Sequence, residues 1–425
     1  RCSGLANASS IENGPGGTVI LGAYGGTAVV SGDLLVDGES GGDIHVSARD
    51  IEVSDEALFS ASALEDGDGG AIEVVATNSA TFAGRLCLRG GLHRGDGGRA
   101  EVSGANTLSF TGAVDAGAPA GTRGSLLLDP ATYTIDATNV GPINGANADT
   151  TVQADDWIAV NAQINMANDG VALTLESDQV NLNSGRIASR GDLTIDGDLH
   201  LGSTSRLITY GGDLRLKGAV TATAGAALWT HTKVNYPGGA NDPGDGAVRF
   251  EAPVQLTAAA GTPSFFSVEA GNGTVQFDAD VSTDRIDVSS CGTFTNNGTL
   301  TVDDELNITV GTDLAAGDDS IWSSAKGSHF VDSLANGLLS GFFGGGSLEA
   351  NGFGIVDIDV DLDGDLDVGG GATGQVDGTV GGSLNVPNGI TGDVSAGGGI
   401  PTPGDGLYDL WRHATSSLDD LLLGT

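Results

Sequence analysis

The fold is decided by short stretches such as GDLTIDGDLHL, at residues 191–201. Leucine and isoleucine stand only at odd positions of this stretch, and the polar side chains stand at even positions. Because successive side chains of a strand point to opposite faces, this alternation predicts a strand with one core face and one solvent face. The same alternation recurs at 275–281, 306–310 and 356–362, in runs too short for helices and bounded by Gly, Asn or Asp.

The beginning of this stretch is also repeated along the chain. Pentapeptides similar to GDLTI begin at Gly32, Gly42, Gly212, Gly364 and Gly382. A period of about 20–30 residues with strand patterns predicts stacked β-coils, in which each coil buries the apolar face of its neighbour. The alternatives are sandwiches or propeller blades, but aromatic residues make up only 5% of the chain and the repeats are shorter than a four-stranded blade. We therefore predict an all-β solenoid.

Three segments divide the chain. The solenoid is predicted to cover residues 1–386, and the Gly- and Pro-rich residues 387–404 are expected to form a linker. Apolar residues at helical spacing predict a short C-terminal amphipathic helix at 405–425, which caps the solenoid or docks onto a partner. Its apolar face comprises Leu407, Leu410, Trp411, Ala414, Leu418, Leu421 and Leu422.

The chain is strongly acidic. Its 425 residues include 56 Asp and Glu against 17 Lys and Arg, for a formal net charge of −39. Such a charge excludes nucleic acid and anionic membranes as partners, since a phosphate backbone needs the opposite sign. Salt screens this repulsion beyond about 8 Å at 0.15 M. A saline extracellular setting therefore suits the composition, and stability is expected to rise with salt.

Cysteine usage and the chain start carry less information. Cys2, Cys87 and Cys291 form no C-x-x-C pair and are expected to be buried or incidental, with a Cys2–Cys87 bridge as the alternative. No stretch approaches the about 20 apolar residues of a membrane span. The N-terminus lacks the pattern of a signal peptide and starts within the repeats, so we expect a mature or trimmed piece of a longer precursor.

An ordered set of motifs in the first third resembles the filamentous haemagglutinin-like exoproteins of bacterial two-partner secretion. GDGGAIEV at 67–74 and GDGGRAEVSG at 95–104 are similar to that family's GGxxEVSG coils. GSLLLDP at 124–130, followed by YTID at 133–136, is similar to its GxLLLDPxxxTI segment. The resemblance begins at GGTVIL, residues 16–21, and covers roughly residues 16–136.

The resemblance implies a right-handed parallel β-helix, export through an outer-membrane transporter, and display on or release from a bacterial cell surface. It implies roles in adhesion, aggregation or biofilm matrix. The Asn-Pro-Asn-Gly-type motifs of the family's secretion domain are missing. Either that domain was removed or this chain is exported differently.

One acidic run is a weak calcium candidate. Asp359, Asp361, Asp363 and Asp365 follow the spacing at which a calcium loop begins. The twelfth position of that loop is Gly370, where a bidentate Glu would be needed. The alternation also explains the run without a metal, as the outward residues of strands whose inward residues are apolar. Both interpretations stay open, and Ca²⁺ is the only cofactor that the sequence suggests.

Other motifs are weaker. The triplets at 94–96 and 190–192 read Arg-Gly-Asp, which suggests integrin-type adhesion, but Gly-Asp is also the standard turn of this chain. The histidines are scattered, and neither a G-x-S-x-G elbow nor a Walker-type loop occurs. A carbohydrate-active β-helix enzyme, such as a polysaccharide lyase or hydrolase, is the alternative function. Carboxylates are too abundant here to mark a catalytic pair.

The sequence therefore predicts a secreted, non-catalytic structural and adhesive protein, either a surface fibre or a filament subunit. Because a solenoid has two open strand-bearing ends, end-to-end self-association is the first expected interaction. Host or neighbouring cell surfaces and glycans are the further expected partners, with no nucleic acid and no catalytic residues.

Overall fold

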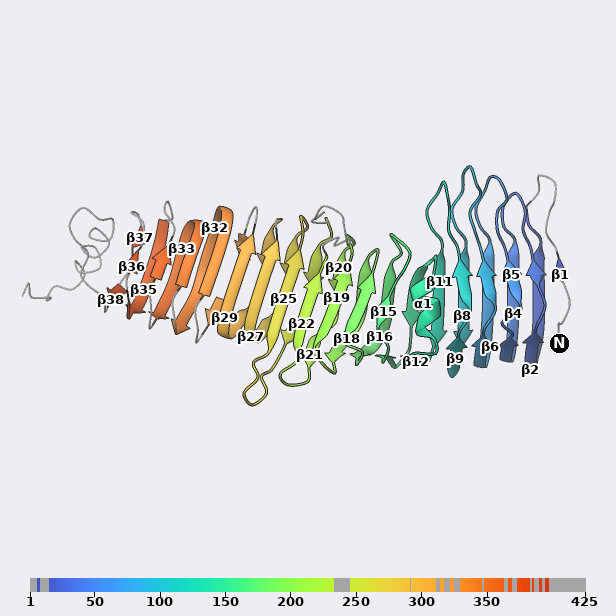
Figure 1. The fold of residues 1–425 in the computed structure, drawn as a ribbon, viewed down its shortest axis with the longest axis horizontal. Coiled ribbons are helices and arrows are strands. Elements are labelled where there is room, and N and C mark those ends of the chain that lie inside the picture. Colours follow the sequence, from blue (N-terminus) through green and yellow to red (C-terminus); the bar gives the residue numbers. More distant parts are fainter. Residues whose placement is uncertain are drawn as a thin grey trace, which may run out of the picture. The chain divides into compact units, whose positions relative to one another are not determined.

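The structure, a computed structural model, describes most of the chain up to residue 310 and a set of strands after it. The described residues are 6–7, 15–232, 245–290, 292–310, 314–316, 322–324, 329–345, 348–362, 366–368, 373–382, 384–385, 390–391 and 394–396. This part is nearly all β, and its strands build a large parallel sheet of many strands together with a smaller one (Figure 1). The predicted all-β class is confirmed. The chain divides into two compact units, Arg1–Gly202 and Ser203–Thr425.

The first unit contains strands β1 to β18 and one short helix. Their bounds are β1 (Ala6–Asn7), β2 (Thr18–Val30), β3 (Leu34–Leu35), β4 (Asp43–Val53), β5 (Leu58–Ser60), β6 (Ala71–Phe82), β7 (Arg85–Cys87), β8 (Arg99–Gly104), β9 (Thr107–Phe110), β10 (Ala113–Asp115), β11 (Ser125–Pro130), β12 (Thr132–Ile135), α1 (Val140–Gly145), β13 (Asp149–Gln153), β14 (Trp157–Val160), β15 (Ile164–Asn165), β16 (Leu173–Leu182), β17 (Arg186–Ser189) and β18 (Leu193–Leu201).

Each long strand of this unit pairs in parallel with the equivalent strand one repeat later. Ile44 of β4 pairs with Ile72 of β6, which pairs with Ala100 of β8, which pairs with Leu126 of β11. Alongside this ladder, β1, β3, β5, β7 and β10 form the second parallel sheet. The repeats therefore stack in register, and residues of one parity meet across successive strands.

The inward parity is apolar and buried, as the alternation predicts. Leu193, Ile195, Leu199 and Leu201 of β18 are at most 1% exposed, while Asp198 between them is exposed. Full burial of each such side chain contributes about 1.5–3 kcal/mol. The β16–β18 pairing shifts register between Glu176 and Gln179. The extra residue lies in β16, and it lets Leu173 and Leu175 before it and Val180 and Leu182 after it all face inward.

Glycine pairs mark the corner before β4, β6 and β8, and Gly124 alone stands at the corner before β11. A Cβ on Gly70 would lie 1.9 Å from the carbonyl oxygen of Gly42, and one on Gly98 would lie 2.1 Å from that of Gly70. On Gly124 it would lie 2.0 Å from the oxygen of Gly98. The neighbouring backbones approach too closely for any side chain, which explains why glycine recurs once per repeat at this corner.

The helix α1 is an insertion that the alternation does not predict. It lies between β12 and β13, and Ile143 packs from it into the core. Asn139 fixes its start, because its Oδ1 accepts from the amide of Asp136 and its Nδ2 donates to the carbonyl of Thr134, both at 2.8 Å. The segment VGPING contains Gly and Pro, so helix propensity alone gives no signal there.

The second unit contains strands β19 to β38. Their bounds are β19 (Ser205–Thr209), β20 (Leu214–Leu216), β21 (Val220–Ala222), β22 (Ala227–His231), β23 (Val248–Phe250), β24 (Val254–Gln255), β25 (Phe265–Ala270), β26 (Val275–Phe277), β27 (Val281–Ser290), β28 (Phe294–Asn296), β29 (Leu300–Val310), β30 (Leu314–Ala316), β31 (Trp322–Ser324), β32 (His329–Gly345), β33 (Leu348–Leu362), β34 (Leu366–Val368), β35 (Thr373–Val380), β36 (Leu384–Asn385), β37 (Ile390–Thr391) and β38 (Val394–Ala396).

Phenylalanines form part of the core in the described part of the second unit. Phe277 contacts Phe250, Phe266 and Phe294, with ring centroids 5.1–5.8 Å apart, and all four are at most 1% exposed. Val248 pairs with Val275, which pairs with Phe294, so these rings come from successive repeats. The ring stack links the strands along the direction in which they pair.

Parallel pairing continues into the segment that the sequence predicts to be a linker. Within 387–404, β37 and β38 both pair with β35. The predicted C-terminal helix at 405–425 lies outside the described residues, so it stays a prediction. No helix in the described part is long and apolar enough to cross a membrane.

Candidate binding site between Arg89 and Arg123

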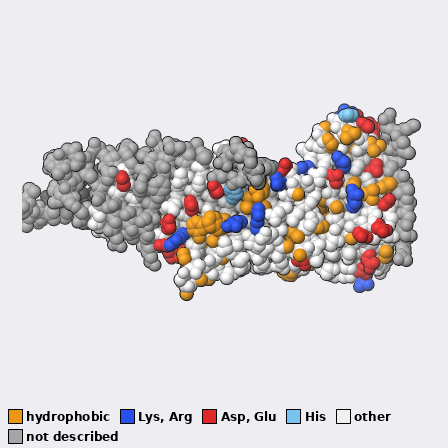
Figure 2. All heavy atoms as spheres, viewed as in Figure 1, with side chains coloured by type: hydrophobic (Ala, Val, Ile, Leu, Met, Phe, Trp, Pro, Cys, Tyr) orange, Lys and Arg blue, Asp and Glu red, His pale blue; other side chains and the backbone are white. Residues whose placement is uncertain are grey.

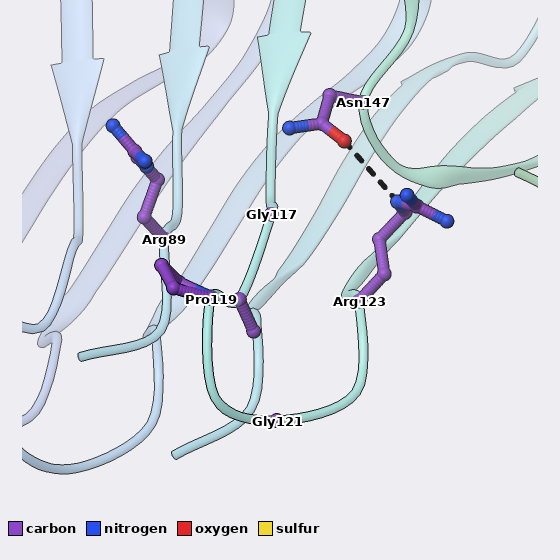
Figure 3. Close-up of a pocket in the computed structure, with 7 residues that line it drawn as sticks. Arg89, Gly117, Pro119, Gly121, Arg123 and Asn147 are labelled. Carbon is purple, nitrogen blue, oxygen red and sulfur yellow. Dashed lines mark hydrogen bonds between the residues drawn. The ribbon is translucent and has the colours of Figure 1, made fainter. Parts of the chain in front are cut away.

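Two arginines and an asparagine surround a polar hollow on the loops of the first unit. Arg89 follows β7, Arg123 precedes β11, and Asn147 precedes β13. The loop 117–121 between β10 and β11 lines the rest of the hollow, which has a volume of about 370 Å³. Figure 3 shows Arg89 on one side of this loop and Arg123 with Asn147 on the other. The residues come from three successive repeats and meet because those repeats stack.

The loop is held by the repeat before it. The amide of Thr122 donates to Asp96 Oδ1 at 2.7 Å, and the amide of Gly97 donates to the carbonyl of Thr122 at 2.8 Å. The bonds from Thr122 keep the pKa of Asp96 below its ordinary value. A Cβ on Gly121 would lie 2.2 Å from the carbonyl oxygen of Gly95, so the loop needs glycine there. These contacts fix the backbone from which Arg123 extends.

A chain of polar contacts crosses the hollow and orients its donors. Asn147 Nδ2 donates to Asp115 Oδ1 at 2.7 Å, which turns the Asn147 carbonyl toward Arg123 Nε at 3.2 Å. The amide of Gly117 also donates to Asp115 Oδ1, at 3.1 Å. Arg89 Nε lies 3.6 Å from Asp115 Oδ2, which is longer than a hydrogen bond. Asp115 thus organises the hollow while Arg89 offsets its charge.

Both guanidinium groups keep unused donors. Arg123 Nη2 donates to the carbonyl of Asp169 at 2.9 Å, but its Nη1 has no acceptor among the described residues. No described carboxylate lies within 4 Å of Arg123, in a chain with more than three acidic residues for each basic one. The Arg89 side chain is 53% exposed, and its guanidinium donates no hydrogen bond to the described residues. The arrangement suits an anionic group.

Sequence reasoning missed this site, although the sequence carries one signal for it. Arginine is sparse in most of the chain but occurs at Arg85, Arg89, Arg94, Arg99 and Arg123. The register of the repeats decides which of these come together, and it cannot be read from spacing alone when loop lengths differ.

The acidic run predicted as a calcium site is only partly described. Asp359 and Asp361 belong to β33, where their backbones pair with Asp377 and Thr379 of β35. Asp363 and Asp365 lie outside the described residues. No group of three or more His, Cys, Asp or Glu in the described part is arranged to hold a metal. The calcium site therefore stays a prediction.

Acidic side chains do lie close together on neighbouring strands elsewhere. Burial raises the pKa of Asp129, and the carboxylates of Asp155 and Glu101 raise it further. Burial likewise raises the pKa of Asp287, and Glu269 adds to the effect. Both shifts follow from the desolvation and like-charge repulsion that stacked acidic residues experience.

The two Arg-Gly-Asp triplets are engaged within the structure. Arg94 pairs with Asp66 at 3.2 Å, while the Asp96 carboxylate accepts the Thr122 amide. Arg190 pairs with Asp169 at 2.8 Å and donates to the carbonyl of Met166 at 3.2 Å. Each triplet therefore takes part in contacts within the fold.

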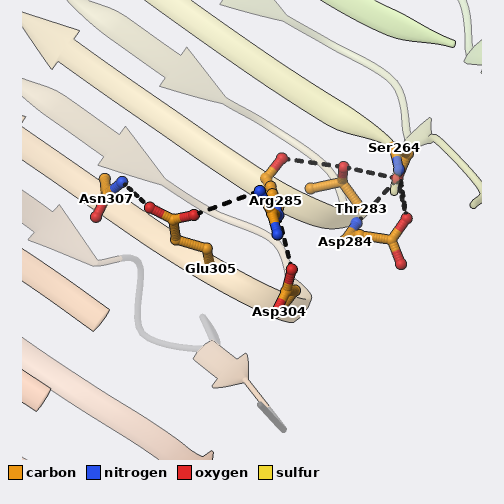
Figure 4. A network of polar contacts seen from close by, with 7 residues as sticks. All are labelled: Ser264, Thr283, Asp284, Arg285, Asp304, Glu305 and Asn307. Atoms are coloured by element: carbon orange, nitrogen blue, oxygen red, sulfur yellow. Dashed lines mark hydrogen bonds and ion pairs between the residues drawn. The ribbon is translucent and has the colours of Figure 1, made fainter. Parts of the chain in front are cut away.

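A second polar network, in the second unit, ties neighbouring strands together (Figure 4). The amide and the hydroxyl of the buried Ser264 both donate to Asp284 Oδ2 at 2.6 Å. Arg285 Nε donates to Asp304 Oδ2 at 2.6 Å, and this bond raises the pKa of the guanidinium. The network links Ser264, next to β25, with β27, and links β27 with β29.

An aromatic cluster on the surface of the second unit is also internally paired. Hydrophobic side chains gather beside basic ones around β19, β22 and β25 (Figure 2). Trp229, 38% exposed, packs against Phe265 at 4.8 Å between ring centroids, and the Arg206 guanidinium lies 5.9 Å from its ring centroid. Ring stacking and the cation–π contact stabilise the Trp229 side chain in this position. The contacts of Trp229 lie within the cluster, so it offers less to a ligand than the hollow does.

Comparisons of the chain with protein-family models, with curated proteins and with solved structures give no match.

Proposed function

We propose that this chain is a right-handed parallel β-helix that acts as a non-catalytic structural and adhesive protein outside a bacterial cell. The observation that carries the proposal is the parallel register. In each unit, a strand pairs with the strand one repeat later, for example Ile44 with Ile72 and Val248 with Val275. Such pairing buries a continuous apolar core and leaves an extended polar surface for contact with other molecules.

The acidic composition and the motif resemblance support a location on or outside the cell. A net charge of −39 disfavours nucleic acid and anionic lipid but suits a saline exterior. The corner glycines Gly70 and Gly98 belong to the two GGxxEVSG-like segments. Those segments therefore form equivalent parts of two successive repeats, as they would in a haemagglutinin-like β-helix. Because of this resemblance, we propose an outer-membrane transporter as the partner during export.

Self-association through the ends of the helix is the proposed mode of assembly. Strand edges at an open end can pair with another copy, and heterologous contacts that do not close generate filaments. The predicted amphipathic segment 405–425 provides an apolar face for docking. Surfaces of host or neighbouring cells, and their glycans, are the proposed targets of adhesion.

Negative-stain electron microscopy of the full chain over a concentration series tests this assembly. We expect end-to-end chains that lengthen with concentration. Leu418→Asp, on the predicted apolar face, should shorten them, while the matched charge at Ser417→Asp, off that face, should not. Dispersed monomers at the highest concentration would overturn the filament, and equal effects of the two variants would overturn the role of the helix.

A reducing-sugar assay on acidic and neutral polysaccharides tests the alternative, a carbohydrate-active enzyme. We expect no release above a heat-denatured control. Release that increases with protein concentration would replace the proposed function by a lyase or hydrolase.

A weak surface Ca²⁺ site at Asp359, Asp361, Asp363 and Asp365 is a separate proposal. Calcium at five times its dissociation constant would stabilise the protein by about 1 kcal/mol. After chelation, the unfolding midpoint should therefore rise in millimolar calcium, and Asp361→Asn should abolish the rise. An unchanged midpoint would remove the proposal.

A further inference from the structure

We propose that the hollow between Arg89 and Arg123 binds a small ligand through its carboxylate group. This goes beyond a structural and adhesive role, which needs no pocket for a small molecule. The proposal rests on the donors that the hollow keeps unused, on their fixed positions and on its size.

The unused donors match a carboxylate. A guanidinium presents planar N–H groups that bind the two oxygens of a carboxylate in parallel, which an ammonium or a single amide cannot do. Arg123 Nη1 has no acceptor among the described residues, and Arg89 faces the same hollow with no hydrogen bond there. A ligand carboxylate at Arg123 Nη1 would satisfy a donor that otherwise depends on water, while Arg89, on the other side of the loop 117–121, adds positive charge (Figure 3).

The Arg123 guanidinium is also held in place before any ligand arrives. Asn147 accepts from Arg123 Nε at 3.2 Å, and the carbonyl of Asp169 accepts from its Nη2 at 2.9 Å. Two contacts on one guanidinium fix its plane, so binding costs little side-chain entropy. Asp169 itself pairs with Arg190 at 2.8 Å, so its carboxylate is already partly neutralised.

The carboxylate of Asp115 would repel a ligand carboxylate, but neighbouring groups of the hollow partly neutralise it. Its Oδ1 accepts from Asn147 and from the amide of Gly117, while Arg89 lies 3.6 Å from its Oδ2. The side chains that line the hollow carry two positive charges and no negative one, while the carboxylates of Asp115 and Asp96 accept hydrogen bonds from backbone amides of its loop. Repulsion from the rest of the acidic chain is screened beyond about 8 Å at 0.15 M salt.

The size of the hollow limits the ligand. Ligand pockets span about 300–1,000 Å³, and about 370 Å³ lies at the small end of that range. Ala118 and Pro119 line it with apolar atoms next to the charged groups. A ligand of this size is a small molecule with one carboxylate, such as a hexuronate or an amino acid. Both classes would be recognised through the carboxylate.

Calorimetric titration of the full chain at constant ionic strength tests the proposal. The probes are sodium glucuronate and sodium glutamate, with glucose as the neutral control and sodium sulfate as the anion that lacks a carboxylate. A hydrogen bond to a charged group contributes enough that losing one weakens binding about tenfold or more. We therefore expect Arg123→Gln to weaken carboxylate binding at least about tenfold, and Arg89→Gln, which removes positive charge without a direct contact, to weaken it by less.

Arg49→Gln is the matched control, because it makes the same change in net charge on a side chain that is 60% exposed and distant in sequence from the hollow. It should leave binding unchanged. Binding of glucuronate alone would identify a sugar acid and binding of glutamate alone an amino acid, and either result supports the proposal.

Three results would overturn it: no heat with either carboxylate up to about 20 mM, sulfate binding as tightly as the carboxylates, or binding that both arginine variants leave intact. Thermal unfolding of each variant controls for folding, and the half-exposed Arg89 provides the variant least coupled to stability. Because the titration involves no assembly, its failure is distinguishable from failure of the filament in electron microscopy.

Discussion

Replacing Gly98 by alanine should destabilise the first unit strongly, because the corner has no space for a methyl group. A Cβ at this position would lie 2.1 Å from the carbonyl oxygen of Gly70 and 2.8 Å from the carbonyl carbon of Gly69. Ordinary contact begins near 3.4 Å, so two backbones must separate by about 1 Å. Neither atom belongs to a side chain that could rotate away.

The cost follows from the bonds that this separation strains. The amide of Arg99 donates to Gly70 and the amide of Ser125 donates to Gly98, both at 3.0 Å. Losing each contributes about 1 kcal/mol, and overpacking itself costs about 1–3 kcal/mol. We therefore expect Gly98→Ala to lower the free energy of unfolding by about 2–5 kcal/mol.

Urea denaturation followed by circular dichroism measures the loss, and hydrogen exchange of peptides covering 95–104 localises it. The matched control is Gly141→Ala, because a Cβ at Gly141 in α1 meets nothing within 4 Å. Alanine favours a helix over glycine by about 1 kcal/mol, so this variant should be neutral or slightly stabilised. Equal denaturation midpoints for the two variants would refute the close packing of glycine corners.

Two further predictions concern the second unit. Phe277→Ala removes a ring that contacts Phe250, Phe266 and Phe294, so it should cost about 3–5 kcal/mol in urea denaturation, and a loss below about 1 kcal/mol would contradict the ring stack. Burial raises the pKa of Asp278, but hydrogen bonds from Arg249, Gln276 and Asn297 outweigh it and leave the pKa lowered. A carboxylate with a lowered pKa stabilises the folded state above its unfolded pKa, near 3.9, and loses that contribution as the pH falls. Asp278→Asn should therefore reduce the loss of stability between about pH 5 and 3, which thermal unfolding across that range would measure, and an unchanged acid slope would contradict it.

The sequence predicts well which face of each strand is buried, because apolar and polar residues alternate along the strand as buried and exposed positions do. The inward residues of 191–201 are buried as expected, and the glycines of the repeated GG segments stand at the corners. Parallel pairing at an offset of one repeat is a consequence of these two features. The helix α1 is not predictable in this way, since its position depends on hydrogen bonds of Asn139 rather than on helix propensity.

The candidate site is harder to predict than the strands, for a physical reason. Arg89, Asn147 and Arg123 belong to loops, and loops of different length bring different residues together. Ala100 pairs with Leu126, whereas Ile72 pairs with Ala100, so the offset between repeats is not constant. Only the register of the flanking strands determines which arginines share a hollow. The acidic run at 359–365 was the more conspicuous pattern because charge is visible in sequence and register is not.

A cross-linking experiment tests the parallel stacking of repeats most directly. Thr81 of β6 and Ser109 of β9 are register partners, and both are exposed. Paired strands lie about 4.8 Å apart, within the range that a disulfide spans, whereas a partner two residues away lies at about 8 Å, beyond it. In a chain whose three native cysteines are replaced by serine, Thr81→Cys with Ser109→Cys should oxidise to an intramolecular disulfide. Thr81→Cys with Thr107→Cys, equally exposed but off register, should stay reduced. Mass spectrometry that finds the disulfide in the second pair and not in the first would contradict the parallel register.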